Sequence, residues 1–281
     1  MLAFRDVTFD GIGDLMNSRI STASRAGLAA CLCLVATAAF AQATATQKQP
    51  YEPKVGQAGK DVVWVPTPQE LVNKMLDMAK VTPQDFVMDL GSGDGRTVIT
   101  AAKRGATAVG IEYNPDMVEL AKRNAEKEGV TGKATFMKAD LFETDLSKAT
   151  VITMFLLPDI NIKLRPKILN LKPGTRVVSN SFTMEDWEDD ATETVSGECV
   201  SWCTAHFWIV PAKVEGTWQT PQGDLKLTQE FQQVKGTLGT QQVTGKLLGD
   251  QLTLTADNKT IYTGRVNGNS IQGTAWSATR R

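Results

Sequence analysis

Residues 87–95 place a loop with glycine at every second position directly after an apolar stretch. The stretch carries Asp89 near its end, and the glycines are Gly91, Gly93 and Gly95. Backbone without a Cβ atom can turn sharply and lie against a ligand, and a neighbouring carboxylate suits a ligand with an ammonium group. The spacing is not that of a dinucleotide fingerprint, because the third glycine comes one residue early, and no Gly-Lys-Ser/Thr is present. The loop therefore predicts a strand-to-helix turn that binds a ligand of another class.

Short apolar stretches alternate with helical patterns after this loop. A helix over 96–104 ends at Gly105, and Asn114 and Pro115 begin another. Further strands are expected at 107–111, 134–139, 150–156 and 175–182, followed by an antiparallel pair at 192–195 and 200–210. This alternation predicts an α/β fold with a doubly wound, Rossmann-like parallel sheet, which binds ligands at the carboxyl ends of its strands. Glu112 and Asp140 end the second and third strands, and Glu112 stands where ribose hydroxyls would be held.

Taken together, the glycine loop and the three ordered carboxylates resemble class I S-adenosylmethionine-dependent methyltransferases over about residues 61–210. The resemblance implies S-adenosyl-L-methionine as the cofactor. It further implies that the loop holds the methionine moiety, that Glu112 holds the ribose and that Asp140 holds the adenine amino group. The cofactor-binding residues expected on this basis are Thr67, Asp89, Gly91, Ser92, Gly93, Gly95, Glu112, Asp140 and Leu141. Taken alone, the loop is better explained as a tight βα connection, and Glu112 and Asp140 are each at least as well explained as solvated strand ends; the ordered set favours the cofactor site.

Four further segments are similar to a small family of protein-lysine methyltransferases, whose mitochondrial members modify the c subunit of ATP synthase and the adenine nucleotide carrier. The segments are Val65-Pro-Thr-Pro, DLGSGDGR at 89–96, FLLPDIN at 155–161 and LKPGTRVVS at 171–179. In that family the first segment closes over the cofactor, which makes Thr67 a candidate contact. An alternative is that Thr67 only caps the helix expected from Pro68.

The segment after the fourth strand suggests what accepts the methyl group. Adenine and glutamine N-methyltransferases of this class have Asn-Pro-Pro-Tyr or a similar sequence there, whereas this chain has Phe155-Leu-Leu-Pro-Asp. An apolar mouth formed by Phe155, Phe182 and Trp187 would fit the alkyl stem of lysine and tolerate a methylated cation. We therefore expect Phe155 and Trp187 to line the acceptor channel, with Asn161 as a polar contact. The alternative is that these aromatic residues belong to the core.

Composition narrows the classes of partner and metal. The 281-residue chain has a formal charge of −1, so no basic field favours nucleic acid or an anionic membrane. Because His206 is the single histidine, no Cys/His metal spacing exists and no metal is expected. Cys199 and Cys203 fall in a predicted strand, where ~13 Å would separate them at ~3.3 Å per residue, so two free thiols are expected.

The N-terminal residues are typical of a secretory signal peptide. Arg19 and Arg25 precede an alanine-rich apolar stretch at 26–40, and small residues precede a cleavage site after Ala41. Met16 is the more plausible start, because the residues before it are acidic. The apolar stretch is shorter than the ~20 residues that span a bilayer. We therefore expect a signal peptide over 1–41, a periplasmic or secreted protein, and no membrane span in the mature chain.

The remaining chain divides into a flexible leader at 42–60, a cofactor-binding domain at 61–212 and a small antiparallel β domain at 213–281. In the last domain Gly236, Gly245, Gly264 and Gly273 share an apolar-x-Gly-x context, and the pattern recurs after 28 residues. This spacing predicts two related hairpins in a small antiparallel sheet or barrel, with further strands at 225–227 and 252–254.

The resulting functional hypothesis is a transferase that moves the methyl group of S-adenosylmethionine to an amine, with protein lysine preferred over a small amine and with no nucleic-acid partner. A hypothesis of a different class is an exported binding module that keeps the fold without turnover. Its basis is that the cofactor is made in the cytosol, whereas the expected signal peptide sends the chain elsewhere.

Overall fold

The structure is a computed structural model, and it describes residues 50–197 and 199–281. The expected signal peptide, its cleavage site after Ala41, the start at Met16 and the leader up to residue 49 lie outside the described residues. In the described part of the chain, no helix is both long and apolar enough to cross a bilayer.

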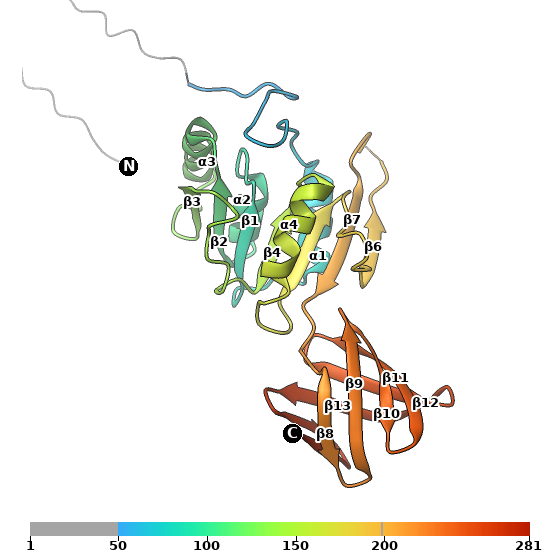
Figure 1. The fold of residues 1–281 in the computed structure, drawn as a ribbon. Coiled ribbons are helices and arrows are strands. Elements are labelled where there is room, and N and C mark those ends of the chain that lie inside the picture. The colour runs from blue at the N-terminus through green and yellow to red at the C-terminus, as the bar shows by residue number, and fades with distance from the viewer. Residues whose placement is uncertain (1–49, 198) are drawn as a thin grey trace, which may run out of the picture. The chain divides into compact units, whose positions relative to one another are not determined.

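A seven-stranded sheet forms the first half of the described chain (Figure 1). Its strand order is β3-β2-β1-β4-β5-β7-β6, and among these strands β7 alone runs opposite to the rest. The strands are β1 (Phe86–Leu90), β2 (Thr107–Glu112), β3 (Ala134–Lys138), β4 (Val151–Met154), β5 (Arg176–Asn180), β6 (Ala191–Thr194) and β7 (Thr204–Ile209). The order reverses between β1 and β4, so the expected doubly wound sheet is confirmed.

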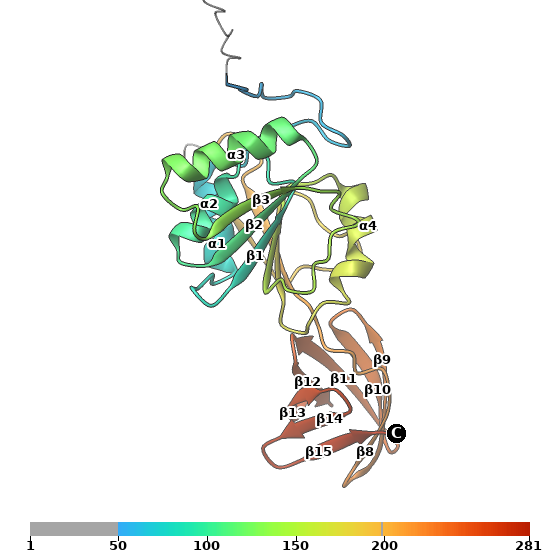
Figure 2. The same ribbon diagram turned by 90° about the vertical axis from the view of Figure 1, so that its left-hand side faces the viewer.

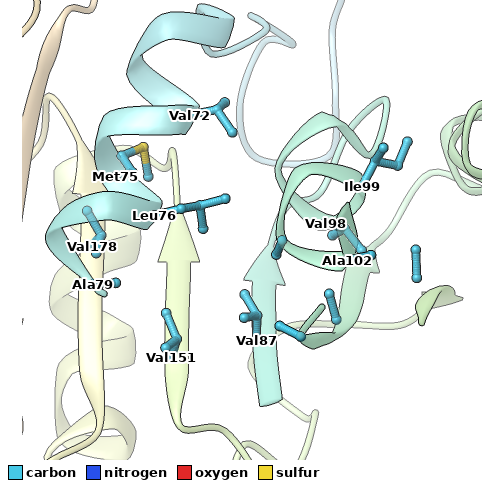
Figure 3. Close-up of a cluster of buried hydrophobic side chains, with 14 of the residues drawn as sticks. Val72, Met75, Leu76, Ala79, Val87, Val98, Ile99, Ala102, Val151 and Val178 are labelled. Atoms are coloured by element: carbon cyan, nitrogen blue, oxygen red, sulfur yellow. The ribbon is translucent and has the colours of Figure 1, made fainter. Parts of the chain in front are cut away.

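Four helices of the described chain cover the two faces of this sheet. The helices α1 (Gln69–Met78), α2 (Arg96–Lys103) and α3 (Pro115–Lys127) lie on one face, and α4 (Pro158–Ile168) lies on the other (Figure 2). In the core on the first face, Val72, Met75 and Leu76 of α1 and Val98 of α2 pack over the strands (Figure 3). Both faces of the central strands are therefore buried, which explains why these strands read as apolar runs and not as an alternating pattern.

The turn between β1 and α2 is packed too closely for side chains. Gly95 precedes α2 with φ of 84°, and a Cβ atom there would lie 2.7 Å from the Phe136 ring and 2.9 Å from Ala121 Cβ. Glycine is required at this position for two reasons, the left-handed backbone and the close approach of β3 and α3. The helix α3 begins as expected, because the Asn114 side chain accepts a hydrogen bond from the Asp116 amide at 2.9 Å.

The segment between β6 and β7 differs from the expectation in two respects. The strand β7 begins at Thr204 and not at residue 200, and Cys199 and Cys203 form a disulfide with their Cα atoms 5.9 Å apart. The prediction of two free thiols was wrong because it assumed extended backbone between them. Residues 199–203 instead lie outside any strand, and the turn within them brings the two cysteines together.

A closed eight-stranded antiparallel barrel follows the sheet. Its strands are β8 (Gly216–Thr220), β9 (Gly223–Glu230), β10 (Gln233–Leu238), β11 (Gln241–Leu248), β12 (Gln251–Ala256), β13 (Lys259–Asn267), β14 (Ser270–Gly273) and β15 (Ser277–Arg280). The two predicted hairpins are β10–β11 and β13–β14. The repeated glycines occupy crowded positions: a Cβ atom would lie 1.8 Å from the Lys226 carbonyl oxygen at Gly236 and 2.1 Å from Trp276 Nε1 at Gly273. Such glycines permit the sharp strand curvature that closes a small barrel.

The crowding at Gly95 gives a prediction about stability. Gly129 also has a positive φ, of 68°, but a Cβ atom there meets nothing within 4 Å. Gly129→Ala should therefore cost only the left-handed backbone, about 1 kcal/mol of unfolding free energy. Gly95→Ala adds overpacking and should cost roughly 2–4 kcal/mol. Urea unfolding followed by tryptophan fluorescence measures both, and equal costs would contradict the packing argument.

Candidate functional site

One pocket lies at the carboxyl ends of β1, β2, β3 and β4. Its wall includes most of the residues expected to hold the cofactor: Thr67, Asp89, Gly91, Ser92, Gly93, Glu112, Asp140 and Leu141. Gly95 does not line the pocket. It contributes indirectly, because the absence of a side chain lets the turn pack against Phe136. The structure thus brings together carboxylates from three separate strand ends, as the parallel topology requires.

Asp89 is the buried carboxylate of this pocket. It is 6% exposed, and its Oδ1 accepts a hydrogen bond from Thr153 Oγ1 at 2.7 Å. The pKa of the Asp89 carboxyl is raised to about 7, chiefly by burial and in smaller part by the negative charges of Asp94 and Glu112, while the Thr153 hydrogen bond opposes the shift. No lysine or arginine among residues 50–197 and 199–281 forms an ion pair with Asp89, so its ionisation is costly.

Glu112 fastens the glycine loop to the end of β2. One carboxylate oxygen accepts the Gly93 amide at 2.9 Å, and the other accepts the Asn114 amide at 2.9 Å. The amides of Gly91 and Ser92 both donate to the Ile111 carbonyl oxygen, at 2.9 Å and 3.0 Å. The loop is thereby fixed on both sides, and each Glu112 oxygen keeps a lone pair for a further donor.

The glycine loop fits the expected cofactor in its shape. Gly91 and Gly93 have φ of 77° and 52°, and added Cβ atoms would lie 3.1 Å from Leu156 Cδ2 and 2.7 Å from Trp64 Nε1. The pocket floor is therefore bare backbone, which lets a ligand approach the main chain. The Ser92 side chain points away from the pocket, because a Cβ atom at Gly110 would lie 2.5 Å from its Oγ. Ser92 can serve a ligand through its backbone only.

Asp140 is paired with a residue from the segment that covers the pocket. Its Oδ2 lies 2.7 Å from Lys60 Nζ, and its Oδ1 accepts the Phe142 amide at 2.9 Å. The hydrogen bond from Lys60 lowers the pKa of the Asp140 carboxyl, with help from the Phe142 amide. Lys60 also lies over the Tyr113 ring, 4.5 Å from its centroid. Lys60 therefore occupies the end of the pocket expected for adenine, a contact that the sequence did not suggest.

The covering segment, residues 56–67, is more ordered than the leader expected to end at residue 60. The Gly56 amide donates to the Trp64 carbonyl oxygen at 2.8 Å, and the Trp64 amide donates to Gln57 at 2.9 Å, which makes a small hairpin. Thr67 follows it, with its Oγ1 accepting a hydrogen bond from Asn180 Nδ2 at 3.2 Å. Helix α1 begins at Gln69 and has no side-chain cap, so the alternative role of Thr67 as a helix cap was wrong.

Beside this pocket lies a second groove with an aromatic wall, which we call the aromatic groove. It shares residues 58–63, Val65, Phe155 and Leu156 with the first pocket and adds Leu157, Phe182 and Trp202. The Phe155 ring lies 6.1 Å from Phe182 and 5.9 Å from Trp202, centroid to centroid. Trp202 was missed by the sequence analysis. The signal that could have found it is the pair of flanking cysteines, which close a loop around it.

Trp187 and Asn161 are not where the channel hypothesis placed them. Trp187 is fully buried, stacks on Phe231 of the β9–β10 turn at 6.0 Å, and lines neither the pocket nor the groove. The channel assignment of Trp187 was wrong because residues after β5 turn toward the barrel. Asn161 is also fully buried, and its Nδ2 donates to the carbonyl oxygens of Phe182 and Thr183 at 3.3 Å and 3.1 Å. Asn161 therefore positions the Phe182 segment and does not face an acceptor.

His206 and the other ligating residues do not form a metal centre in the described part of the chain. His206 Nδ1 lies 2.6 Å from Asp189 Oδ2 on the β6–β7 side of the sheet and does not line the pocket. No group of three or more His, Cys, Asp or Glu side chains within residues 50–197 and 199–281 is arranged to hold a metal ion.

Comparison with known proteins identifies relatives for the sheet domain. Residues 89–191 match the ANTKMT methyltransferase domain. A protein-lysine N-methyltransferase of Saccharolobus islandicus is 52% identical over 129 residues, which cover 45% of this chain and 80% of the relative. The human lysine N-methyltransferase of the ATP synthase C subunit is 35% identical over 128 residues, and the chain spans about half of it, 54%.

A solved structure gives a further match. The crystal structure of an RNA methyltransferase from Salinibacter ruber in complex with S-adenosyl-L-homocysteine is 46% identical, with a TM-score of 0.50. The match covers 53% of this chain and 96% of that chain. That relative binds S-adenosyl-L-homocysteine, the product form of the cofactor expected here from the glycine loop and the three carboxylates.

The raised pKa of Asp89 predicts how stability changes with pH. The folded-state pKa of about 7 lies above the ordinary value, so the unfolded chain loses this proton at a lower pH than the folded chain. The free energy of unfolding therefore falls as the pH rises from about 4 to 7. Asp89→Asn should therefore raise the unfolding free energy of the cofactor-free protein at pH 8 by on the order of 2–4 kcal/mol, and by little at pH 4. Urea unfolding at a series of pH values measures the difference.

Asp85 is the matched control, because its pKa is shifted in the opposite direction. It is also buried, and burial acts to raise its pKa, but hydrogen bonds from Thr82, Thr150 and Arg176 lower its pKa overall. Asp85→Asn should therefore destabilise the protein near neutral pH, and this loss should shrink as the pH falls through the lowered pKa. Destabilisation of the same sign by both substitutions would contradict the assignment for Asp89.

Proposed function

The chain belongs to the S-adenosylmethionine-dependent protein-lysine N-methyltransferase family, and we propose that it methylates lysine side chains of a protein that it meets outside the cytoplasm. The observation that supports this most directly is the adjacency of two sites. The pocket with the glycine loop and the aromatic groove share Phe155, Leu156 and the covering segment. A methyl donor in the first would face an amine that enters through the second.

The cofactor supplies an already activated methyl group when it is bound, so the chain has to hold it, align the acceptor and exclude water. We assign Asp89 to the ammonium group of the methionine moiety, because it is a buried carboxylate that no lysine or arginine of the described residues neutralises. The free lone pairs of Glu112 face the ribose hydroxyls, and the backbone of Gly91 to Gly93 lies along the ligand. No catalytic base is needed to form the methyl donor, which is consistent with a pocket that contains no histidine.

Asp140 and Leu141 form the adenine end in this assignment. Asp140 Oδ1 and Oδ2 each accept one hydrogen bond, from Phe142 and Lys60, and each oxygen can accept another. The adenine amino group can therefore donate to Asp140 without breaking either contact. Lys60 and the Tyr113 ring line the pocket on this side.

The aromatic groove suits a lysine acceptor on physical grounds. A lysine stem in contact with Phe155 loses solvent, and this lowers the pKa of its amine and favours the neutral nucleophile. Aromatic faces also tolerate the cation that forms as methyl groups are added. Among the residues that line the groove, the charged ones are Lys60 and Asp61, so the wall is largely apolar.

RNA is the second candidate acceptor, because the Salinibacter ruber relative is an RNA methyltransferase. Binding of a phosphate backbone depends on lysine and arginine residues that release counterions. The two cations in the pocket wall are already paired, Lys60 with Asp140 at 2.7 Å and Arg96 with Asp94 at 2.6 Å, and the chain has a net charge of −1. These observations favour a protein acceptor.

Export to the periplasm or the exterior is part of the proposal. It rests on the signal-peptide pattern over 1–41, and the Cys199–Cys203 disulfide supports it, because disulfides persist in oxidising compartments. N-terminal sequencing of the protein from its source cells should give Gln42 as the first residue. An intact N-terminus would refute the cleavage.

Methyl transfer itself gives the central test. Protein purified after export is incubated with tritium-labelled S-adenosylmethionine and with the envelope proteins or total RNA of the source cells. We expect label in protein, and mass spectrometry should place it on lysine. Phe155→Ala should lower the rate at least tenfold, because the amine is then less well aligned and more hydrated; unchanged turnover would remove Phe155 from the site. Label in RNA, or cofactor binding without transfer, would support the RNA methyltransferase or the non-catalytic module instead.

Cofactor affinity should depend on pH through Asp89. Below a pH of about 7 the free protein holds Asp89 protonated, so binding of the ammonium group must release that proton. The affinity for S-adenosylhomocysteine should therefore fall about tenfold per pH unit below 7 and stay level just above it. Calorimetry in two buffers of different ionisation enthalpy measures the released proton. Asp89→Asn should bind on the order of 10–100-fold more weakly and without this pH dependence; a wild-type pH profile in that variant would refute the role.

A further inference from the structure

Trp202 lies at the outer side of the aromatic groove and is 43% exposed. Its ring lies 5.3 Å from Phe182 and 5.9 Å from Phe155, at tilted angles of 45° and 56°. The three rings come from three separate segments: the end of β4, the end of β5 and the loop before β7. A large apolar side chain that stays this exposed beside a pocket marks a binding surface more often than a core contact.

The backbone of Trp202 is held in an unfavourable conformation. Its φ is 59°, in the left-handed region that bulky residues rarely adopt. Such a conformation persists only where surrounding structure enforces it, and it is common at ligand contacts. The strained backbone of Trp202 therefore indicates that the surrounding loop enforces the position of its ring at the groove.

Two constraints fix the loop around Trp202. The disulfide joins Cys199 to Cys203, the residue next to Trp202, so the tryptophan lies inside a closed ring of five residues. The Cys203 carbonyl oxygen accepts the Val195 amide at 2.9 Å, which ties the loop to its own entrance. With Cys203 anchored, the disulfide limits the directions that the preceding residue can take.

The other two rings are fixed by the sheet and by α4. Phe155 directly follows β4, and Asn161 of α4 donates hydrogen bonds to the carbonyl oxygens of Phe182 and of its neighbour Thr183. The Ser181 amide also donates to the Thr204 carbonyl oxygen at 2.7 Å, which joins the end of β5 to the end of the disulfide loop. The three rings are therefore a preorganised set, and Trp202 is the member whose position depends on the cysteines.

We propose that Trp202, held by the Cys199–Cys203 disulfide against Phe155 and Phe182, binds the side chain of the acceptor lysine and thereby selects the acceptor. This inference rests on the proposed function, since it names a residue that recognises the substrate of the same site. The ring faces of Phe155, Phe182 and Trp202 contact the alkyl stem and the ammonium group, as aromatic residues do for alkylated ammonium ions. The disulfide is a positioning device that acts through Trp202, and it does not touch the acceptor.

The test measures acceptor binding separately from turnover. The probe is a synthetic peptide that contains the lysine labelled in the methyl-transfer experiment, titrated by calorimetry into protein saturated with S-adenosylhomocysteine. We expect Trp202→Ala to weaken peptide binding at least tenfold and Trp202→Phe to restore it to within about threefold. The affinity for S-adenosylhomocysteine should stay within twofold in both, which shows that the variants are folded. Leu248→Ala, an exposed apolar residue of the barrel, is the control and should change neither affinity.

A cycle of variants tests the role of the disulfide. The double variant Cys199→Ser/Cys203→Ser should weaken peptide binding, and adding Trp202→Ala to it should weaken binding no further than Trp202→Ala alone. Additive losses would show that the disulfide does not act through Trp202. Wild-type peptide affinity in Trp202→Ala would overturn the inference and leave the methyltransferase function standing. If the wild-type protein labels no lysine at all, the proposed function fails first and this inference with it.

Discussion

The turn between β1 and α2 is the constraint on which the rest of the site depends. In place of side chains it offers backbone, and three neighbours fill the volume that Cβ atoms would need: Leu156 at Gly91, Trp64 at Gly93 and Phe136 at Gly95. These contacts come from the end of β4, the covering segment and β3, so the turn fixes three parts of the pocket relative to one another. Glu112 completes the arrangement from β2 by accepting the Gly93 amide. The pocket is therefore rigid where the ligand meets the main chain.

A buried carboxylate at the centre of this pocket lowers the stability of the fold. Asp89 is buried next to Thr153 and within the field of two other acidic residues, and its pKa rises to about 7 as a result. A neutral side chain there would suit the empty fold better, whereas a carboxylate suits a cationic ligand. The fold keeps the less stable choice, as binding sites commonly do. The same trade recurs at Trp202, where a strained backbone conformation keeps a ring at the groove.

The sequence predicts the parallel sheet and its carboxylates because both depend on local patterns. Asp89, Glu112 and Asp140 each end a short apolar stretch, and parallel topology alone brings such ends together. The acceptor side could not be predicted in the same way. Phe182 and Trp187 are separated by a few residues, yet one faces the groove and the other stacks on Phe231 of the barrel. That choice depends on the path of the segment after β5, which has no periodic pattern.

The prediction of two free cysteines failed for a related reason. The distance between Cys199 and Cys203 was derived from strand geometry, and the apolar residues around them resemble a strand. The chain reverses direction there, and no glycine or proline between the two cysteines announces the reversal. A left-handed conformation at Trp202 takes the place of the usual turn residue. A turn that is held by a covalent cross-link cannot be predicted from the usual turn residues.

The reversed direction of β7 has a consequence for how such an enzyme could diversify. Because β7 runs antiparallel to β5 and β6, the loop that joins β6 to β7 returns to the sheet edge where the ligand-bearing turns lie. That loop follows Thr194, whereas the match to the methyltransferase domain ends at residue 191. Of the three rings in the aromatic groove, Phe155 and Phe182 therefore lie within the matched stretch, and Trp202 lies beyond it. A change confined to this hairpin tip would alter one wall of the groove and leave Asp89, Glu112 and Asp140 in place.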